Sequence, residues 1–207
     1  MTQAIELIVG LGNPGGEHLQ DRHNAGFWLA DLIARESGAA FKADKRLQAE
    51  TADVTIGSDR IRLLKPQTYM NASGRSVAAT LSYFKIPPER MLVAYDELDL
   101  APGRAQLKFD GGHGGHNGLR DIVTHIGKAF WRLRLGIGHP GPGRKNEVSG
   151  YVLHRPTAEQ LELMLEAITA AAEAVPVFLG QGAERAKTQL HTRTKAPRPE
   201  PDGDAGD

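Results

Sequence analysis

Hydrophobic and polar positions in the first third of the chain predict strands and one helix. Residues 5–11 are mostly apolar and end in Gly-Asn-Pro-Gly, which indicates a buried strand that feeds a turn. Apolar residues recur at helical spacing over 25–36, and Gly38 would end that helix. Residues 49–56 and 60–65 alternate with period two around a short Gly-Ser-Asp segment, which predicts a hairpin.

The middle of the chain continues the alternation of helix and strand patterns. Residues 73–84 have helical spacing and stop ahead of two consecutive prolines. Residues 91–94 form a short apolar strand pattern, and 104–109 alternate like a second strand. After a glycine-rich loop, 119–126 predict a short helix and 130–137 a further strand.

The last part of the chain predicts a long helix and a tail. Thr157 and Gln160 form a capping-box pattern that would open a helix over 157–179, and 184–191 predict a final helical piece. From Thr192 the chain is rich in Pro, Gly and charge. We therefore expect one folded domain over 1–191 and a disordered tail over 192–207. Alternating strands and helices with a hairpin predict an α/β fold, a mixed twisted β-sheet flanked by helices.

Composition narrows the class of protein more than it identifies a partner. The chain has 207 residues, 40% hydrophobic and 24% charged, with no Cys, so disulfides, thiolate nucleophiles and Cys-based metal sites are excluded. The N-terminus has no basic segment followed by a long apolar run, and no stretch reads as a membrane span. We expect a soluble, cytoplasmic protein without a membrane partner. The formal net charge of zero means that any RNA affinity must come from a local basic patch.

The segment Gly10-Leu11-Gly12-Asn13-Pro14-Gly15 matches the dinucleotide-binding pattern G-x-G-x-x-G literally. That pattern should open directly into a helix whose N-terminus holds a pyrophosphate. Here residues 16–22 are polar, and helical periodicity begins only near Ala25. Asp31, at about the spacing of the expected acidic residue, falls inside the predicted helix rather than after a strand. We therefore take Asn-Pro-Gly as a turn.

Two candidate polar residues, Asn13 and Asp96, follow apolar strand patterns, and in α/β sheets such positions lie at the edge where sites form. His23 stands at the mouth of the first helix, either as an incidental surface residue beside an Asn24 N-cap or as a general base. A helix N-terminus disfavours a protonated imidazole, so we expect it to help keep His23 neutral. A carboxylate from Asp96 would fix the tautomer of such a base.

Other polar segments admit both a structural and a functional interpretation. Asn71 precedes a helix and either caps it or offers an amide to a peptide or a water. The acidic segment at 96–99 is either a solvated turn or a divalent-metal site. The glycine-rich loop 110–118 allows close approach to a ligand; its His113 and His116 lack an evident third metal ligand. Six basic residues of this half form either an ordinary solvated face or a local basic patch: Lys108, Arg120, Arg132, Arg134, Arg144 and Lys145.

Six segments, taken in order, resemble bacterial-type peptidyl-tRNA hydrolase. They are IVGLGNPG at 8–15, RHNAG at 22–26, MNASG at 70–74, DELD at 96–99, GGHNGL at 114–119 and RLRLGIGHP at 132–140. The resemblance covers about residues 5–190. It implies a monomeric α/β hydrolase without cofactor or metal that cleaves the ester between peptide and tRNA and so recycles tRNA.

The resemblance also implies roles for individual residues. His23 would be the catalytic histidine and Asp96 the carboxylate that orients it. The substrate-binding residues would be Asn13, Asn71, Asn117, Tyr69, Met70, His116 and His18. Lys108 and Arg134 would clamp the 5′-phosphate of the tRNA acceptor stem. The hypothesis is that His23 takes a proton from a water held near Asn117 while Asn13 or Asn71 stabilises the oxyanion.

The chain departs from the family pattern at two positions. His18 stands where Tyr is common, and Gln106 stands where the family often has a second Lys of the phosphate clamp. The second departure predicts either a weaker clamp or one shifted toward Arg144 and Lys145. Two other functions remain as alternatives: a nicotinamide-binding oxidoreductase, and a non-catalytic RNA-binding protein on the same fold.

Overall fold

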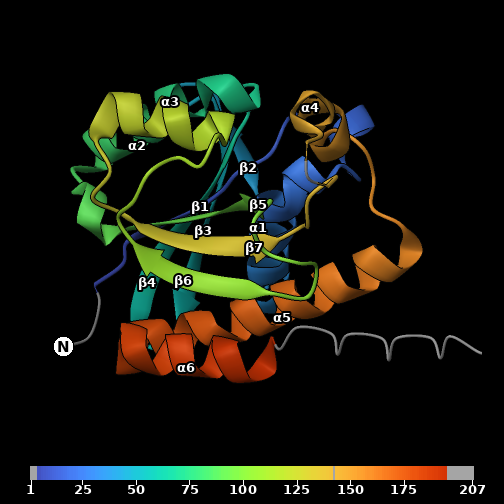
Figure 1. Cartoon of the computed structure of the whole chain (residues 1–207). Helices are drawn as coiled ribbons and strands as arrows, with labels where there is room; N and C mark the ends of the chain where they lie inside the picture. Colours follow the sequence, from blue (N-terminus) through green and yellow to red (C-terminus); the bar gives the residue numbers. More distant parts are fainter. Residues whose placement is uncertain (1–3, 142, 195–207) are drawn as a thin grey trace, which may run out of the picture.

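A seven-stranded mixed sheet forms the centre of the computed structural model, which describes residues 4–141 and 143–194 (Figure 1). Its spatial order is β2-β3-β4-β1-β5-β7-β6. Strands β4, β1, β5 and β7 are parallel, and the antiparallel β2, β3 and β6 complete the two sides. The strands are β1 Leu7–Gly10, β2 Lys42–Asp44, β3 Ala49–Ile56, β4 Asp59–Pro66, β5 Met91–Glu97, β6 Ala105–Phe109 and β7 Trp131–Gly136.

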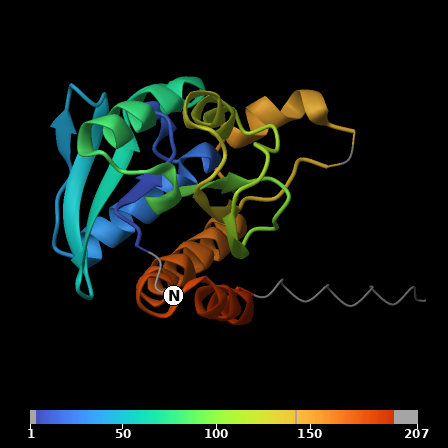
Figure 2. The same cartoon turned by 90° about the vertical axis from the view of Figure 1, so that its left-hand side faces the viewer.

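Helices cover both faces of this sheet. One face carries α2 and α3, and the other carries α1, α5 and α6 (Figure 1). Figure 2 shows β2–β4 and the short α4 at opposite sides of the molecule. The α-helices are α1 Ala25–Glu36, α2 Ser73–Phe84, α3 Asn117–Ile126, α4 Val148–Val152, α5 Ala158–Gln181 and α6 Ala183–Arg193. Short 3-10 turns are η1 Gly16–His18, η2 Arg22–Asn24, η3 Met70–Ala72, η4 Pro88–Arg90 and η5 Lys145–Glu147.

The apolar run of β1 shows why the chain forms a two-faced core. Leu7 and Val9 belong to the cluster beneath α2 and α3, while Ile8 belongs to the cluster beneath α1 and α5. All three side chains are fully buried. A parallel strand covered on both faces is apolar at every position, because alternate side chains enter opposite layers. The loops that follow the carboxyl ends of the parallel strands are therefore attached to a sheet that is buried on both faces.

The structure confirms the expected fold and most of its elements. The helix over residues 25–36, the helix over 73–84 and the hairpin are present, and Thr157 and Gln160 form the expected capping box. Strand β5 extends to Glu97, three residues beyond the expected end, so Asp96 lies within the strand rather than after it. Neither β2 nor α4 was predicted.

The boundary of the expected tail is wrong by three residues. Helix α6 continues to Arg193. Thr194 is buried, and its hydroxyl bonds with the backbone of Ala105 on the edge strand β6. These bonds tie the last helix to a strand edge that would otherwise lack partners. Residues 195–207 lie outside the described residues.

Among the described helices, only α5 is long and apolar enough to cross a membrane. By length and composition, α5 therefore contradicts the expectation that no segment of the chain resembles a membrane span. More than half of the apolar window is buried inside the fold, and Phe178 packs against Trp131 of β7. The apolar character of α5 thus serves the core of the domain.

The glycines of the dinucleotide-like segment are explained by close packing of α1. A Cβ on Gly10 would lie 2.3 Å from the carbonyl oxygen of Gly26, and a Cβ on Gly12 would lie 2.6 Å from the Phe27 ring. A Cβ on Gly26 would in turn lie 2.4 Å from the Ala94 carbonyl oxygen. The glycines let α1 approach β1 and β5, which brings the preceding η2 turn against the end of the sheet.

Candidate active site

The carboxyl ends of β1, β4 and β5 open into one cleft of about 580 Å³. The loops after β1 and β4 and the end of β5 all contribute to it, as expected where parallel strands end at one edge. The glycine-rich loop and α4 complete its walls. The lining residues are Asn13, His23, Tyr69, Met70, Asn71, Asp96, Glu97, Leu98, His113, Gly114, Gly115, His116, Asn117, Val148, Ser149, Val152 and Leu153.

His23 and Asp96 meet inside this cleft. The Nδ1 atom of His23 lies 2.8 Å from Oδ1 and 2.9 Å from Oδ2 of Asp96. His23 is 6% exposed and Asp96 3% exposed. The interpretation of His23 as an incidental surface residue is therefore wrong. An ionised carboxylate only accepts, so Nδ1 carries the proton and Nε2 is left as the basic atom.

Asp96 has a second imidazole partner in His116. The Nε2 atom of His116 lies 2.9 Å from Oδ1 of Asp96, and its Nδ1 accepts the backbone N–H of Leu119 at 3.2 Å. His116 thereby caps α3 and can only donate to Asp96. The resemblance implied that His116 binds the substrate. The capping geometry shows that His116 also braces the carboxylate.

The pKa values of the pair shift in the directions that favour an ion pair. Burial alone would lower the pKa of His23, but the charge and hydrogen bonds of Asp96, with a smaller effect of Asp21, raise it above its ordinary value. Burial alone would raise the pKa of Asp96, but His23 and His116 hold it well below its usual range. The helix N-terminus was expected to help keep His23 neutral, but the pKa of His23 is raised instead, because the buried Asp96 carboxylate is in direct contact with the ring.

Asn13 is held by a network that the sequence did not reveal. Its backbone N–H donates to Oδ1 of Asn24 at 2.9 Å, and Nδ2 of Asn24 donates back to the Asn13 carbonyl at 2.9 Å. Asn24 therefore does not cap α1 with its side chain, as one interpretation had it. The Oδ1 atom of Asn13 accepts the backbone N–H of Met70 at 2.7 Å. The amide NH₂ of Asn13 is thus the group left for a substrate.

The remaining expected substrate-binding residues line the same cleft with different exposure. Met70 is buried, and a Cβ on Gly118 would lie 2.6 Å from its sulfur, so the two fix one wall. Tyr69 is 64% exposed at the rim. Asn71 and Asn117 are exposed, each at the beginning of a helical segment. Both side-chain amides can therefore reach a ligand or a water in the cleft.

His18 is not among the residues that line the cleft. Its Nδ1 lies 2.7 Å from Oδ2 of Asp21. Asp21 precedes η2 and is one of the groups that raise the pKa of His23. In this structure His18 is therefore connected to the site through Asp21 rather than through the cleft wall.

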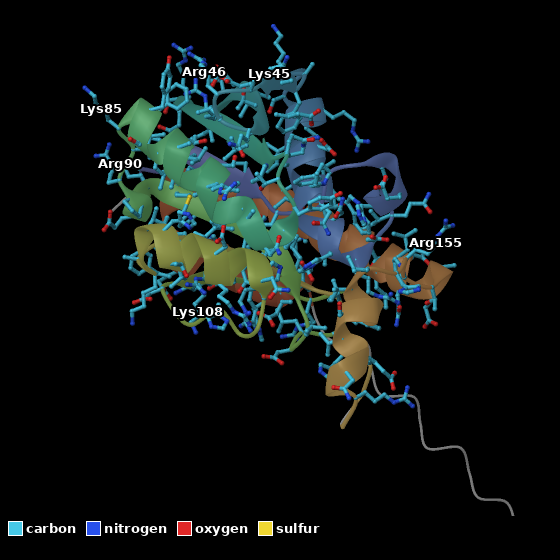
Figure 3. The ribbon with its side chains drawn as sticks, turned by 90° about the horizontal axis from the view of Figure 1, so that it is seen from above. Lys45, Arg46, Lys85, Arg90, Lys108 and Arg155 are labelled. Atoms are coloured by element: carbon cyan, nitrogen blue, oxygen red, sulfur yellow. The ribbon has the colours of Figure 1, made fainter. Side chains whose placement is uncertain are left out.

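Lys108 and Arg134 lie beyond the rim, on the neighbouring strands β6 and β7. In the antiparallel register Gln106 is opposite Arg134 and Lys108 is opposite Arg132, so these side chains share one face of the sheet. Arg134 donates from Nε to Glu97 at 2.9 Å and from Nη1 to Gln106 at 2.7 Å. Lys108 is exposed and lies on the α3 side of the molecule, away from Lys45 and Arg46 (Figure 3).

Within residues 4–141 and 143–194, His23, Asp96 and His116 form a group of side chains that could hold a metal ion, since their nitrogen and oxygen atoms all lie within 4.8 Å of one another. The nitrogen and oxygen atoms of each pair lie 2.8–2.9 Å apart, which is the distance of a hydrogen bond between donor and acceptor. The tautomers derived above account for both contacts with protons alone. The donor set is therefore arranged as a proton-handling site.

A histidine with one free basic nitrogen, a buried carboxylate behind it and amides around one cleft define a hydrolase on an α/β sheet. A family model described as peptidyl-tRNA hydrolase matches residues 7–198. The peptidyl-tRNA hydrolase of Xanthomonas campestris pv. campestris is 51% identical over 193 residues, 93% of this chain and 99% of the relative. That of Variovorax paradoxus is 48% identical over 198 residues, 95% of this chain and 93% of the relative.

A crystal structure of peptidyl-tRNA hydrolase from Acinetobacter baumannii superposes with a TM-score of 0.90 at 46% identity, covering 95% of this chain and 99% of the other. The chain belongs to the peptidyl-tRNA hydrolase family. It hydrolyses the ester bond of peptidyl-tRNA and releases peptide and tRNA. The nicotinamide-dependent and non-catalytic alternatives are thereby set aside.

Proposed function

We propose that His23 acts as the general base that activates the attacking water. Its Nε2 takes one proton from a water positioned beside Asn117, and the water oxygen bonds to the ester carbonyl carbon. Collapse of the tetrahedral intermediate breaks the bond to the ribose oxygen, which leaves with the proton from the imidazolium. The observation that carries this proposal is the pairing of Nδ1 with Asp96, which fixes the base at Nε2.

Amide donors would stabilise the oxyanion that forms on the carbonyl oxygen. Asn13 can donate from its NH₂ group there, because its side-chain oxygen accepts the Met70 N–H and so fixes the orientation of the amide. Asn71 lies on the same wall and offers a second amide. Such donors are preorganised when their own partners hold them, and the Asn13–Asn24 pair does so.

A direct attack by the His23 nitrogen on the ester is the competing mechanism. Rapid-quench mass spectrometry during a single turnover of N-acetyl-aminoacyl-tRNA distinguishes the two. Attack by water leaves the mass of the enzyme unchanged at every time point. An enzyme heavier by the acyl group, formed and lost at the rate of turnover, would contradict water attack.

We also propose that Lys108 and Arg134 bind the 5′-phosphate of the acceptor stem. Both are cations on one sheet face near the cleft, and A-form RNA is recognised mainly through phosphates and 2′-hydroxyls. Glu97 partly neutralises Arg134, so Lys108 should supply the larger share of the charge.

Measuring the affinity for tRNA against salt concentration tests this clamp. Each lost phosphate contact reduces the slope of log K on log salt by about 0.7–0.9. Lys108→Ala should show this reduction in full and Arg134→Ala in part, whereas the exposed Arg75→Ala on α2 should leave the slope unchanged. An unchanged slope in both clamp variants would remove these residues from the phosphate site.

A monomeric, cytoplasmic enzyme that needs no cofactor or metal completes the proposal. The support is that one chain supplies both the base and its carboxylate, and that the sequence contains no Cys. Sedimentation of the full chain tests the oligomeric state. Activity after dialysis against a chelator tests the need for a metal. A loss of activity that a divalent ion restores would contradict the proposal that the enzyme needs no metal.

A further inference from the structure

Arg22, the residue before the catalytic histidine, is a buried charge that the mechanism does not use. It is 6% exposed, and its guanidinium lies 4.0 Å from the centre of the Tyr151 ring. Burying a cation is costly unless hydrogen bonds replace its water. The partners of Arg22 therefore show what the residue is for.

Those partners lie in α4, on the segment that joins it to α5, and in the first turn of α5. Nη1 is within hydrogen-bond distance of three carbonyl oxygens, those of Tyr151 (3.1 Å), His154 (2.9 Å) and Arg155 (3.1 Å). Nη2 donates to Oε1 of Gln160 at 2.7 Å. The backbone N–H of Arg22 also donates to the His154 carbonyl. One side chain thus gathers the carbonyls at the C-terminal end of α4, where a cation is favoured.

Helix α4 needs such an anchor. It has five residues, too few to be stable alone, and it projects from the body of the domain (Figures 1 and 3). Glycines with positive φ at 138, 141 and 143 precede it. The Tyr151 hydroxyl also connects α4 to the chain that follows β7, because it donates to the Ile137 carbonyl at 2.7 Å.

Helix α4 also forms a wall of the active-site cleft, through Val148, Ser149, Val152 and the adjacent Leu153. Three of these four side chains are apolar, whereas the catalytic wall consists of His23, Asp96 and amides. A peptide whose ester lies at His23 would lie in a cleft that is bounded by both walls. The position of α4 relative to His23 therefore determines how well the peptidyl end fits.

We propose that Arg22 is a positioning residue that holds the α4 wall at a fixed distance from the catalytic histidine and so sets the affinity for the peptidyl end of the substrate. Arg22 precedes His23 in the chain, and its side chain forms hydrogen bonds at the C-terminal end of α4. One residue therefore connects the catalytic wall to the α4 wall. The proposal uses the role of His23 proposed above only to place the chemical step.

Loosening this anchor should reduce affinity and leave the chemical step intact. His23 is oriented by Asp96 through its own hydrogen bonds, which Arg22 does not share. If the wall occupies its binding-competent position one-tenth of the time, the apparent dissociation constant rises about tenfold while the rate in the bound complex is unchanged. If Arg22 had a purely structural role, its loss would lower the unfolding temperature without weakening binding selectively over the rate in the bound complex.

The test is Arg22→Lys, which keeps the charge but cannot reach all four acceptors. Under single-turnover conditions with N-acetyl-dipeptidyl-tRNA, the half-saturating enzyme concentration should rise about five- to twentyfold, with the limiting rate within twofold of wild type. Amide hydrogen exchange over residues 148–153 should accelerate. The exposed Arg35→Lys at the end of α1 is the matched control and should change neither parameter.

Two variants of Gln160 make the test independent of one substitution. Gln160→Met removes one acceptor and should raise the half-saturating concentration two- to threefold. Arg22→Lys with Gln160→Glu supplies a Lys–Glu pair and should recover part of the lost affinity. A fall in the limiting rate larger than the rise in half-saturating concentration, or no change in either for Arg22→Lys and Gln160→Met, overturns the proposal. The acid limb of the wild-type rate profile separately tests His23 as the base.

Discussion

The substitution Asp96→Asn probes the contact on which catalysis depends. It keeps the size of the side chain and removes its charge. Asn offers one oxygen where Asp96 presents two, and both His23 and His116 need that acceptor. The NH₂ group would then face an imidazole nitrogen. This favours the tautomer with the proton on Nε2, in which His23 cannot act as a base.

The size of the effect follows from what the carboxylate does in the transition state. As Nε2 gains a proton the imidazole becomes a cation, and Asp96 holds its Nδ1–H through a charge-assisted bond shared by both oxygens. Hydrogen bonds to charged groups contribute about 1.5–3 kcal/mol. At about 1.36 kcal/mol per factor of ten, the limiting rate should fall about 10- to 150-fold, and further if the wrong tautomer dominates.

The assay is single-turnover hydrolysis of N-acetyl-aminoacyl-tRNA measured across pH. Wild type should lose activity on the acidic side around the pKa of His23, which Asp96 raises above its ordinary value. In Asp96→Asn burial acts without the opposing carboxylate, so the acid limb should move to lower pH while the plateau falls. The affinity for tRNA should be unchanged.

A wild-type plateau in Asp96→Asn, or an acid limb that stays in place, would refute this reasoning. The first result would mean that the carboxylate does not stabilise the imidazolium in the transition state. The second would mean that the limb reports another group. Ser82→Ala on the exposed end of α2 should reproduce the wild-type profile and serves as the control for handling and substrate quality.

Three further outcomes are expected. His116→Ala removes a donor from Asp96, so its carboxylate should act more strongly on His23; the acid limb of the rate profile should move to higher pH, and no movement would contradict the shared-acceptor geometry. Gly26→Ala places a Cβ 2.4 Å from the Ala94 carbonyl oxygen and should lower the free energy of unfolding, measured with urea, by about 3 kcal/mol. A variant as stable as wild type would show that α1 is not tightly packed against β5 at this point. Because the folded pKa of Asp96 is lowered, its contribution to stability is present above about pH 3.9 and is lost as pH falls toward the folded value; the unfolding temperature between pH 5 and 3 should decline more steeply in wild type than in Asp96→Asn.

The layers of the fold and the two central residues of the site, His23 and Asp96, could be predicted from the sequence. Long periodic segments such as 25–36 and 73–84 specify helices because one whole face of each is buried. Asp96 was found because it follows the apolar run of a parallel strand. The strand β2 and helix α4 were missed because they are three and five residues long, too short for periodicity to be recognised.

The connections among side chains could not be read from the sequence. Asn24 has the position of an N-cap, yet its amide bonds with Asn13 eleven residues earlier in the chain. Arg22 reaches carbonyls about 130 residues away. Such contacts depend on which loops meet at the sheet edge, and local pattern carries no information about this. The raised pKa of His23 was missed for the same reason, because it depends on the distance between the ring in η2 and a carboxylate on strand β5.

The rate of His23→Ala measures the central claim most directly. In single-turnover hydrolysis of N-acetyl-aminoacyl-tRNA at saturating enzyme, loss of the base should slow the reaction about 10²–10⁴-fold, while the fold and the affinity for tRNA persist. His113→Ala changes a histidine that lines the same cleft but does not contact Asp96 among the described hydrogen bonds, and it should stay within a few-fold of wild type. A folded His23→Ala enzyme that hydrolyses the ester at the wild-type rate would contradict the account.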